Sequence, residues 1–219
     1  MAIAFDTSSQ GTAGADPSGS HTCTGSDRLL IVIVGSATDT NTGVTYNGVA
    51  MTQVTATSYP GAGYQGLKMW YLNNPASGSN TIAVTSSNAG TNYTAQSFTG
   101  CDQTSSVVDS SAVNNNATGT TSLTVTTTVV ASNCWLVGGS SNNQGTEVFG
   151  GTGTTVRQYT GQGGACGDSN ATVSTGSQSL IFTQPGSTLF RGIIMSIAPS
   201  TAVAGATRDA RALALLGVG

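Results

Sequence analysis

The sequence predicts an all-β protein, an antiparallel β-sandwich of jelly-roll-like type. Three observations support this prediction: short segments rich in Val, Ile, Thr and aromatic residues recur along the chain, clusters of Gly, Pro, Asn and Ser separate them, and good helix formers gather only after Pro199. A chain of 219 residues fits one such domain. We expect a sandwich domain over residues 1–199, followed over residues 200–219 by a C-terminal arm that is extended or forms a short helix.

The clearest single element is a β-hairpin within the segment GVTYNGVAMTQV. Asn47 and Gly48 supply the two residues with positive φ that a type I′ turn requires. A two-residue turn at this place pairs Tyr46 with Val49 across the hairpin. Four apolar side chains then share one face of the hairpin: Val44, Tyr46, Val49 and Met51.

The other predicted strands follow one another at short intervals. They are, in order, the segments RLLIVIVG, LKMWYL, NTIAVTS, YTAQSFTG, SLTVTTTVV, CWLVGG, ATVST, SLIFTQ and LFRGIIMSIA. The run Leu29–Val34 is apolar at every position, so we expect it in the middle of a sheet with both faces covered. The segment SLTVTTT alternates between apolar and hydroxyl side chains, so we expect one of its faces to be exposed.

Charged residues make up only 7% of the chain, whereas a typical soluble domain has about 25%. Apolar residues make up 37%, which is enough for a core at this length. The surface must therefore consist mostly of hydroxyls, amides and glycine, and a net charge of −3 opposes close packing of many copies only weakly. Nucleic acid is disfavoured as a partner, because binding a duplex relies on clustered Lys and Arg, and Lys68 is the only lysine.

The N-terminal segment MAIAFDTSSQG does not have the basic region and apolar run of a signal peptide. We also expect no membrane-spanning segment, because the longest apolar run, Leu29–Val34, is far shorter than the roughly 20 residues that a bilayer requires. The content of Thr, Ser, Asn and Gly is nevertheless typical of secreted and surface-displayed β proteins. Either a leader has been removed, or the protein reaches the outside without one, as the parts of a virus particle do on lysis.

Four cysteines lie far apart in the sequence, and none belongs to a C-x-x-C pair, so the sequence does not predict a zinc site. We expect Cys23, Cys101 and Cys134 to be small buried side chains on strands or at strand ends. Cys166 lies in GQGGACGDSN, a segment with the composition of a flexible loop. If any thiol is exposed or bridged to another segment, we expect it to be Cys166; the spacing leaves the disulfide pairing open.

The motifs predict no catalytic residues, no cofactor and no metal ion, so we expect that the protein is not an enzyme. The segment GAGYQG matches the G-x-G-x-x-G pattern of dinucleotide-binding proteins, but it precedes a predicted strand instead of a helix. There is no G-x-S-x-G elbow, and we expect the single histidine, His21, to be structural. Asp39–Gly43 resembles half of a calcium loop without its closing glutamate. We expect Asp102 and Asp109 to hydrogen-bond the backbone of their own loop.

The aromatic residues divide between core and surface. Trp70 and Tyr71 are adjacent on a predicted strand and must point to opposite faces. Trp70 and Trp135 have the apolar neighbours of inner strands, so we expect both in the core. Three tyrosines lie in segments predicted to be loops: Tyr59, Tyr64 and Tyr159. We expect these three at the surface, where aromatic faces can stack on sugar rings.

The order of several segments resembles a known module. The chain contains, in this order, SHTCTGSDRLLIVIVG, GVTYNGVAMTQV, MWYLNNPASGSNTIAVT, AQSFTGCDQTSSV and NCWLVGG. Together they resemble a β-sandwich module that recurs in structural proteins of tailed bacteriophages and in some bacterial surface proteins. The resemblance covers the chain from Phe5 to Gly139 and, more loosely, as far as Ala198, without the cysteines or the tail after Pro199. It implies a structural role, such as a capsid decoration, fibre or tail component, and brings no catalytic residues.

The leading hypothesis is a non-enzymatic virion protein that decorates or cements the surface of a phage capsid. Its expected partners are copies of itself, with a trimer favoured, and other virion proteins such as the major capsid protein. The alternative hypothesis is a carbohydrate-binding or adhesive module of a phage fibre, phage tail or bacterial surface protein. Such a module would bind host-surface glycans through the three loop tyrosines and through Asn and Gln amides.

The last residues, RDARALALLGVG, differ from the rest of the chain by their clustered Ala, Arg and Leu. About nine helix-competent residues are marginal in water unless they dock, and chain ends fray when nothing holds them. We expect this segment to act as an arm that holds a neighbouring subunit. Its expected contact residues are Arg208 and Arg211 as polar clamps, with Leu213, Leu215 and Leu216 as apolar anchors.

Overall fold

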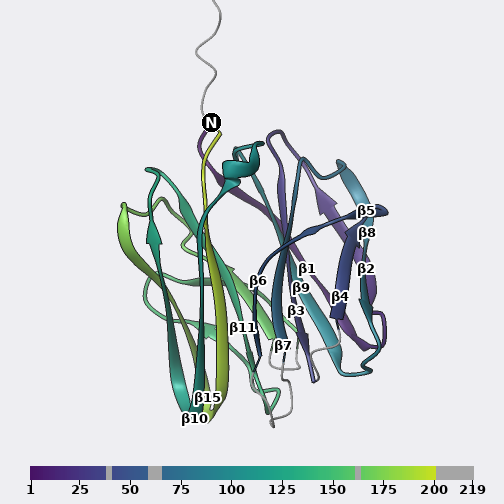
Figure 1. The fold of residues 1–219 in the computed structure, drawn as a ribbon, viewed down its shortest axis with the longest axis vertical. Helices are drawn as coiled ribbons and strands as arrows, with labels where there is room; N and C mark the ends of the chain where they lie inside the picture. Colours follow the sequence, from purple (N-terminus) through teal and green to yellow (C-terminus); the bar gives the residue numbers. More distant parts are fainter. Residues whose placement is uncertain (38–40, 59–65, 161–163, 201–219) are drawn as a thin grey trace, which may run out of the picture.

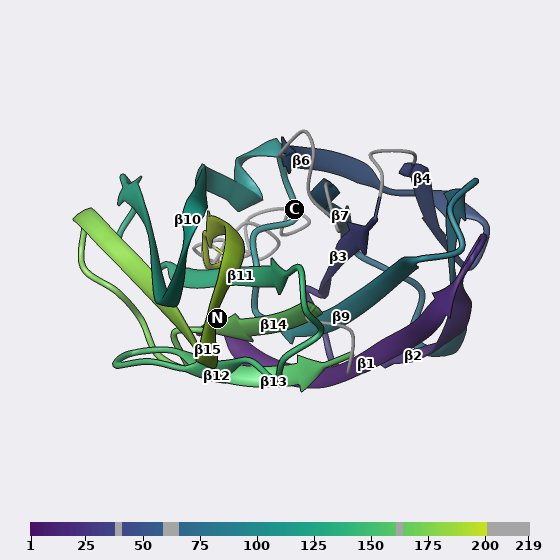
Figure 2. The ribbon, with the colours of Figure 1, turned by 90° about the horizontal axis from the view of Figure 1, so that it is seen from below.

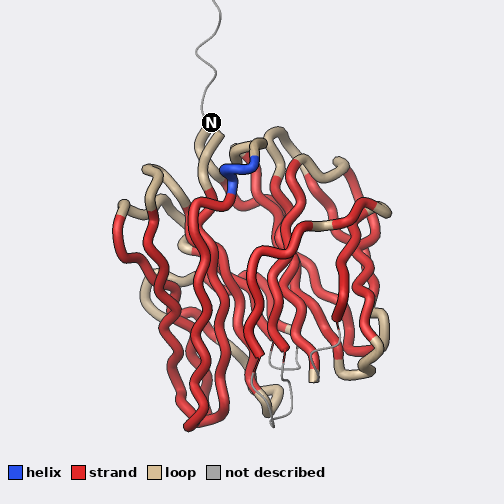
Figure 3. The backbone as a smooth tube through the Cα atoms, in the orientation of Figure 1, coloured by secondary structure: helices blue, strands red, loops and turns tan. Residues whose placement is uncertain are grey.

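The computed structural model describes residues 1–37, 41–58, 66–160 and 164–200. It confirms the all-β prediction: nearly every described segment is a strand, the strand pairs are antiparallel, and the sheets pack as a jelly-roll-like sandwich (Figure 3). The only helical element in these ranges is a 3-10 turn, η1 (Ser105–Val107). The strands are β1 (Ala4–Gly14), β2 (Ser18–Cys23), β3 (Leu29–Ser36), β4 (Asn41–Tyr46), β5 (Val49–Ala50), β6 (Thr52–Ser58), β7 (Gly66–Asn73), β8 (Gly78–Ser86), β9 (Thr91–Thr99), β10 (Val108–Val129), β11 (Trp135–Asn142), β12 (Phe149–Gly150), β13 (Thr155–Tyr159), β14 (Gly164–Asp168) and β15 (Gly176–Ile197).

The central sheet has the strand order β1-β9-β3-β7-β6 and is covered on both faces (Figure 2). Its middle strand, β3, pairs with β7 on one side and with β9 on the other, and every residue of β3 is buried. Successive β3 residues enter two different cores, so Ile31 packs in one and Val32 in the other. This confirms the prediction that Leu29–Val34 lies in the middle of a sheet, because apolar side chains on both faces need a cover on both faces.

The small sheet, β2-β8-β4-β5, covers one face of the central sheet and forms the small-sheet core with it. Tyr46 of β4 anchors this core with a fully buried ring. Its hydroxyl donates to the His21 carbonyl of β2 at 3.1 Å and accepts from the Asn80 side-chain amide of β8 at 3.3 Å. Burial raises the pKa of Tyr46 to about 12, so the hydroxyl remains a donor at neutral pH. One phenol thus ties three strands of the small sheet together.

The large sheet, β10-β15-β11-β14-β13, covers the opposite face of the central sheet and forms the inner core with it; β12 pairs with β15 outside this order. Phe98 of β9 and Trp135 of β11 meet edge to face across this core, with ring centroids 6.1 Å apart. At one open side of the sandwich, the Ser8 hydroxyl of β1 donates to the Arg157 carbonyl of β13 at 3.1 Å. This bond joins the edges of the two sheets.

Strands β10 and β15 form a ribbon that folds back over the outer face of the large sheet. Each is 22 residues long, and their register shifts between Asn116 and Ser122 of β10, where the ribbon bends. Beyond the bend, apolar residues such as Leu123 and Phe182 pack on Ile194 of the large sheet, which creates a third cluster, the ribbon core. The alternation of SLTVTTT is confirmed there, since its apolar side chains are buried and the intervening threonines are exposed.

The ribbon approaches the large sheet so closely that a glycine is required at the contact. A Cβ atom on Gly192 of β15 would overlap the Val125 side chain and lie 3.0 Å from Cδ2 of Leu123. Gly192 therefore leaves the space that these two ribbon side chains fill.

The predicted hairpin is confirmed in turn and register, but it spans two sheets. Asn47 and Gly48 have φ values of 50° and 75°, and Tyr46 pairs with Val49. Val49 is 54% exposed, because β5 is the edge of the small sheet. After Met51 the chain leaves the small sheet, and β6 pairs with β7 in the central sheet.

Both tryptophans lie in the core, as predicted. Trp70 belongs to the small-sheet core and Trp135 to the inner core, and their side chains are buried. Tyr71 packs against the inner core, so it points to the opposite face of β7 from Trp70, which was also predicted. The aromatic residues of the inner strands therefore serve packing.

The two ends of the described fold lie side by side (Figure 1). The Met1 amino nitrogen donates to the Ser200 carbonyl and hydroxyl oxygens, both at 2.9 Å. Pro199 forms an isolated bridge with Cys101, and the Ser200 amide donates to the Gly100 carbonyl at 2.8 Å. The chain is thus held in place up to Ser200.

Candidate functional site

Most residues predicted to bind a partner or a ligand lie outside the described residues. These are Tyr59, Tyr64, Arg208, Arg211, Leu213, Leu215 and Leu216. Tyr159 is described, and the prediction that it lies in a loop was wrong, because it ends strand β13. Its half-buried side chain donates a hydrogen bond from the hydroxyl to the Gly145 carbonyl at 2.6 Å. This bond fixes the ring at the surface.

Tyr159 lines a shallow hollow of about 550 Å³, which we call the β13 trough. Its lining residues are Glu147, Val148, Phe149, Gly150, Val156, Arg157, Gln158 and Tyr159. Phe149 is 48% exposed there, so a large apolar side chain is open to solvent in the trough. No sequence pattern points to Phe149, because a single Phe among glycines and threonines has no periodicity.

The charge of Arg157 is already neutralised within the fold. Its guanidinium donates to the buried Asp168 carboxylate through Nε at 2.7 Å and Nη2 at 2.9 Å. It also lies 4.1 Å above the Phe5 ring. What the trough offers to a ligand is therefore aromatic surface, the Gln158 amide and the Glu147 carboxylate.

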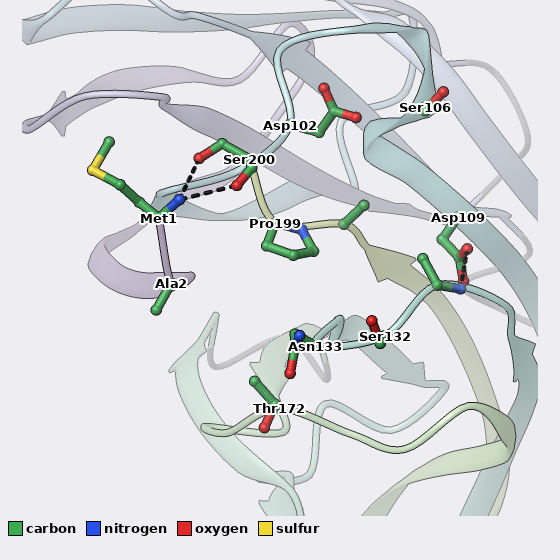
Figure 4. A pocket seen from close by; sticks show the side chains of 12 residues that line it. Met1, Ala2, Asp102, Ser106, Asp109, Ser132, Asn133, Thr172, Pro199 and Ser200 are labelled. Carbon is green, nitrogen blue, oxygen red and sulfur yellow. Dashed lines mark hydrogen bonds between the residues drawn. The ribbon is translucent and has the colours of Figure 1, made fainter. Parts of the chain in front are cut away.

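A larger hollow of about 690 Å³, the terminal pocket, lies where Met1 meets Ser200, the last described residue (Figure 4). Four separate stretches of chain supply most of its lining: the start of the chain, the segment between β9 and β10, the turn after β10 and the end of β15. The lining residues are Met1, Ala2, Asp102, Ser106, Asp109, Ala131, Ser132, Asn133, Thr172, Ala198, Pro199 and Ser200. No local sequence motif predicts such a pocket, because its lining residues are far apart in sequence.

Both carboxylates of the terminal pocket bind backbone amides. Asp102 accepts from the Thr104 amide at 2.8 Å, which is the self-bonded turn predicted from the sequence. Asp109 departs from that prediction, because it lies on β10 and accepts from the Val130 and Ala131 amides at 2.8 and 2.9 Å. It therefore fixes the turn that follows β10, and both side chains still line the pocket.

His21 lies on β2, the edge strand of the small sheet, and its ring faces hydroxyl groups of β1. The Ser9 hydroxyl is 2.8 Å from Nδ1 and the Thr7 hydroxyl is 3.5 Å from Nε2, so both ring nitrogens face hydroxyls. The side chain is 2% exposed. Burial lowers the pKa of His21 from 6.5 to about 4, and the Asp6 carboxylate offsets part of this shift. The ring is therefore neutral at physiological pH.

All four cysteines are free thiols and buried. The prediction for Cys23, Cys101 and Cys134 is confirmed, but the expectation that Cys166 is the exposed or bridged one was wrong. Cys166 lies in the inner core on β14, where a glycine-rich strand passes between close neighbours. Burial raises the pKa of Cys101 and Cys166 to about 12, and it also raises the pKa of Cys23 and Cys134. These thiols are therefore protonated at neutral pH.

Within the described ranges, no group of three or more His, Cys, Asp and Glu side chains is placed to hold a metal ion. Asp39, the first residue of the half calcium loop, lies outside these ranges, as does most of the GAGYQG segment. None of the described residues belongs to a helix that is long and apolar enough to cross a membrane.

No protein-family model matches the chain, and no curated protein or solved structure shows significant similarity to it.

Proposed function

We propose that the protein is a non-enzymatic structural protein of a tailed-bacteriophage particle, which associates with copies of itself and decorates or cements the capsid surface. The observation that supports this proposal best is where the polar side chains form their hydrogen bonds. In the described residues, Asp109 and Asp168, which could serve chemistry, instead bind groups of the protein's own fold, while outward strand faces carry neutral hydroxyls.

Two further aspartates illustrate this use. The Asp6 carboxylate of β1 accepts from the Thr24 amide at 2.8 Å and from the Ser97 hydroxyl of β9 at 2.9 Å. Asp16 accepts from the Ser86 amide at 2.7 Å, and the Asp16 amide donates back to the Ser86 carbonyl at 3.2 Å. Each carboxylate joins segments that are far apart in sequence, which suits a protein whose task is to keep its shape.

The outward face of the ribbon shows the surface that neighbouring copies would meet. Thr124, Thr126 and Thr128 are exposed on β10, and the Thr126 hydroxyl is 2.7 Å from the Ser179 hydroxyl of β15. A copy that packs on such a face does not have to desolvate a charge. The methyl groups of these threonines supply the apolar area, and at about 25 cal/mol per Å² many such modest contacts add up over a symmetric lattice.

The proposal is tested by mass spectrometry of purified phage particles from the source. We expect this chain at a copy number comparable to that of the major capsid protein, and its absence from particles would overturn the proposal. Size-exclusion chromatography with light scattering tests self-association separately. We expect a trimer, and a monomer at every concentration would argue against self-association.

The β13 trough supports a second candidate, a carbohydrate-binding module that recognises host-surface glycans. The exposed Phe149 ring and the fixed Tyr159 ring provide faces on which sugars stack, and Gln158 and Glu147 provide hydrogen-bonding groups beside them. This candidate is compatible with the first, since a decoration protein can also contact a host surface.

A glycan array with the full chain tests this second candidate. We expect binding that the Phe149→Ala variant abolishes and that the Val49→Ala variant preserves, because Val49 is a comparably exposed apolar residue far from the trough. Absence of binding, or equal loss in both variants, would exclude the trough as a glycan site.

A further inference from the structure

The terminal pocket is placed and shaped to receive a segment of the chain that follows it. Ser200 is itself a lining residue, and 19 residues follow it in the sequence. Seven of these residues, 201–207, separate Ser200 from Arg208. When extended, they span about 25 Å, which is enough to lead Arg208 back over the pocket.

The chemistry of the pocket has two parts. Ala131, Ala198 and Pro199 form an apolar part, and the carboxylates of Asp102 and Asp109 form an acidic part. The charged groups of the lining are these two carboxylates and the Met1 ammonium group, which donates to Ser200. A ligand that suits this lining combines aliphatic groups with positive charge that faces the carboxylates.

The segment Arg208–Leu216 has this combination. Arg208 and Arg211 are separated by Asp209 and Ala210, so the segment has two positive charges, one negative charge and a net charge of +1. Three leucines follow at positions 213, 215 and 216. The four basic side chains of the described residues already have partners within the fold: Arg157 pairs with Asp168, Arg28 donates to the Pro75 and Gly25 carbonyls, Lys68 donates to the Asn41 carbonyl, and the buried Arg191 has a partner as well. The segment is also the one place in the sequence where two arginines and several leucines fall within nine residues.

We propose that the terminal pocket binds the segment Arg208–Leu216 of its own chain, with leucine side chains against Ala198 and Pro199 and guanidinium groups near Asp102 and Asp109. The tether makes this an intramolecular event with an effective concentration in the millimolar range. Weak contacts of each kind are then sufficient for docking. The proposal does not depend on the function proposed above.

Disulfide trapping in the full chain tests this proposal directly. A pocket cysteine, Ser132→Cys, is combined with an arm cysteine, Ala212→Cys, and oxidised mildly. The native thiols do not compete, because all four are buried. The control combines Ala212→Cys with Ser26→Cys, an exposed position that does not line the pocket. Ser26 is also close to Ser200, because the Ser200 amide donates to the Gly100 carbonyl and the Gly100 amide donates to the Ser26 carbonyl, so the tether alone favours neither pair.

We expect the pocket pair to form an intramolecular disulfide about tenfold faster than the control pair, measured by intact mass and peptide mapping. Equal rates for the two pairs would overturn the proposal. A disulfide that links two chains instead of one, seen as a dimer on a non-reducing gel, would also overturn docking in the same chain.

The charged contacts have their own test in the same trapping experiment. Changing Arg208→Glu and Arg211→Glu together should slow the trapping about fivefold, because the acidic part of the pocket then repels the segment. The matched change of both residues to Lys should leave the rate nearly unaltered, since it retains the charge. If the Glu and Lys variants trap at the same rate, the carboxylates do not take part.

Discussion

His21 shows how a single buried ring makes the stability of the fold depend on pH. Its folded-state pKa of about 4 lies below the ordinary value of 6.5, because burial disfavours the charged ring. The unfolded chain therefore binds a proton at a pH where the folded chain does not. The stabilisation is fully present above about pH 6.5 and is lost as the pH falls towards 4.

We expect the free energy of unfolding to fall by about 2 kcal/mol between pH 7.5 and pH 5 because of this one residue. Urea denaturation of the native chain and of His21→Gln at both pH values measures this contribution, because the neutral Gln side chain removes the titration. The pH dependence of the variant should be weaker by that amount. An equal pH dependence in both proteins would show that His21 does not titrate below its ordinary range.

Among the elements, the hairpin at Asn47 and Gly48 offers a place to measure the free-energy cost of one backbone conformation. Gly48 has a φ of 75°, and a Cβ atom added there would meet nothing within 4 Å. Gly48→Ala should therefore destabilise the protein by about 1 kcal/mol through backbone strain alone.

The matched control is Gly43→Ala on the same strand pair, because Gly43 also has open space around it but no positive φ. We expect its free energy of unfolding to stay within about 0.5 kcal/mol of the native value. Equal effects of the two substitutions in denaturant titrations would contradict the assignment of the cost to the turn.

The folded ribbon depends on a different property of glycine, its lack of volume. Gly192→Ala would drive a methyl group into Val125 and Leu123 of the ribbon, so we expect a loss of about 2 kcal/mol by overpacking. Gly186→Ala, at the ribbon bend with open space around it, should be nearly neutral by the same thermal or urea measurement. A neutral Gly192→Ala would mean that the ribbon moves away easily.

These elements also show what the sequence can predict. The hairpin and β3 follow from local rules, because turn chemistry and apolar pattern act over a few neighbouring residues. Cys166 was misjudged for a physical reason: its glycines resemble those of a loop, yet they allow a buried strand to pass close to others. A Cβ atom on Gly167 would lie 2.6 Å from the Thr155 carbonyl oxygen, and one on Gly164 would lie 2.7 Å from Oδ1 of Asn92. Composition alone does not distinguish a flexible glycine from a tightly packed one.

In the whole molecule, the central sheet should make unfolding a single cooperative event. Strand β3 contributes to the inner core with one set of side chains and to the small-sheet core with the other. Neither core can open without breaking the strand that both share. Strand β15 links the ribbon core in the same way, because Ile193 packs in the inner core and Ile194 in the ribbon core. We therefore expect one transition for the entire described fold.

The two tryptophans provide separate probes of this cooperativity, since Trp70 reports on the small-sheet core and Trp135 on the inner core. Fluorescence of the single-tryptophan variants Trp135→Phe and Trp70→Phe should give urea midpoints that coincide with the midpoint from circular dichroism of the same variant. Distinct midpoints from the two methods within one variant would show that the layers unfold separately.

The candidate sites depend on the fold of the whole molecule, which explains why the sequence did not predict them. The terminal pocket combines residues from the start of the chain with Asp102, Asn133, Thr172 and Pro199. Nothing in the local pattern around any of these residues indicates that they meet. Their proximity results from the sheet topology, which the sequence pattern predicts as a class but not as a set of contacts.

The closeness of Met1 and Ser200 has a practical consequence for how this fold can be joined to other proteins. A short peptide from residue 200 to residue 1 would close the backbone into a ring, and new ends could then be opened at an exposed turn such as Asn47–Gly48. For the same reason, the unit could be inserted into a surface loop of a host protein without pulling the two sides of that loop apart. The sandwich would then be attached to its host at one end only, and its opposite end would face solvent.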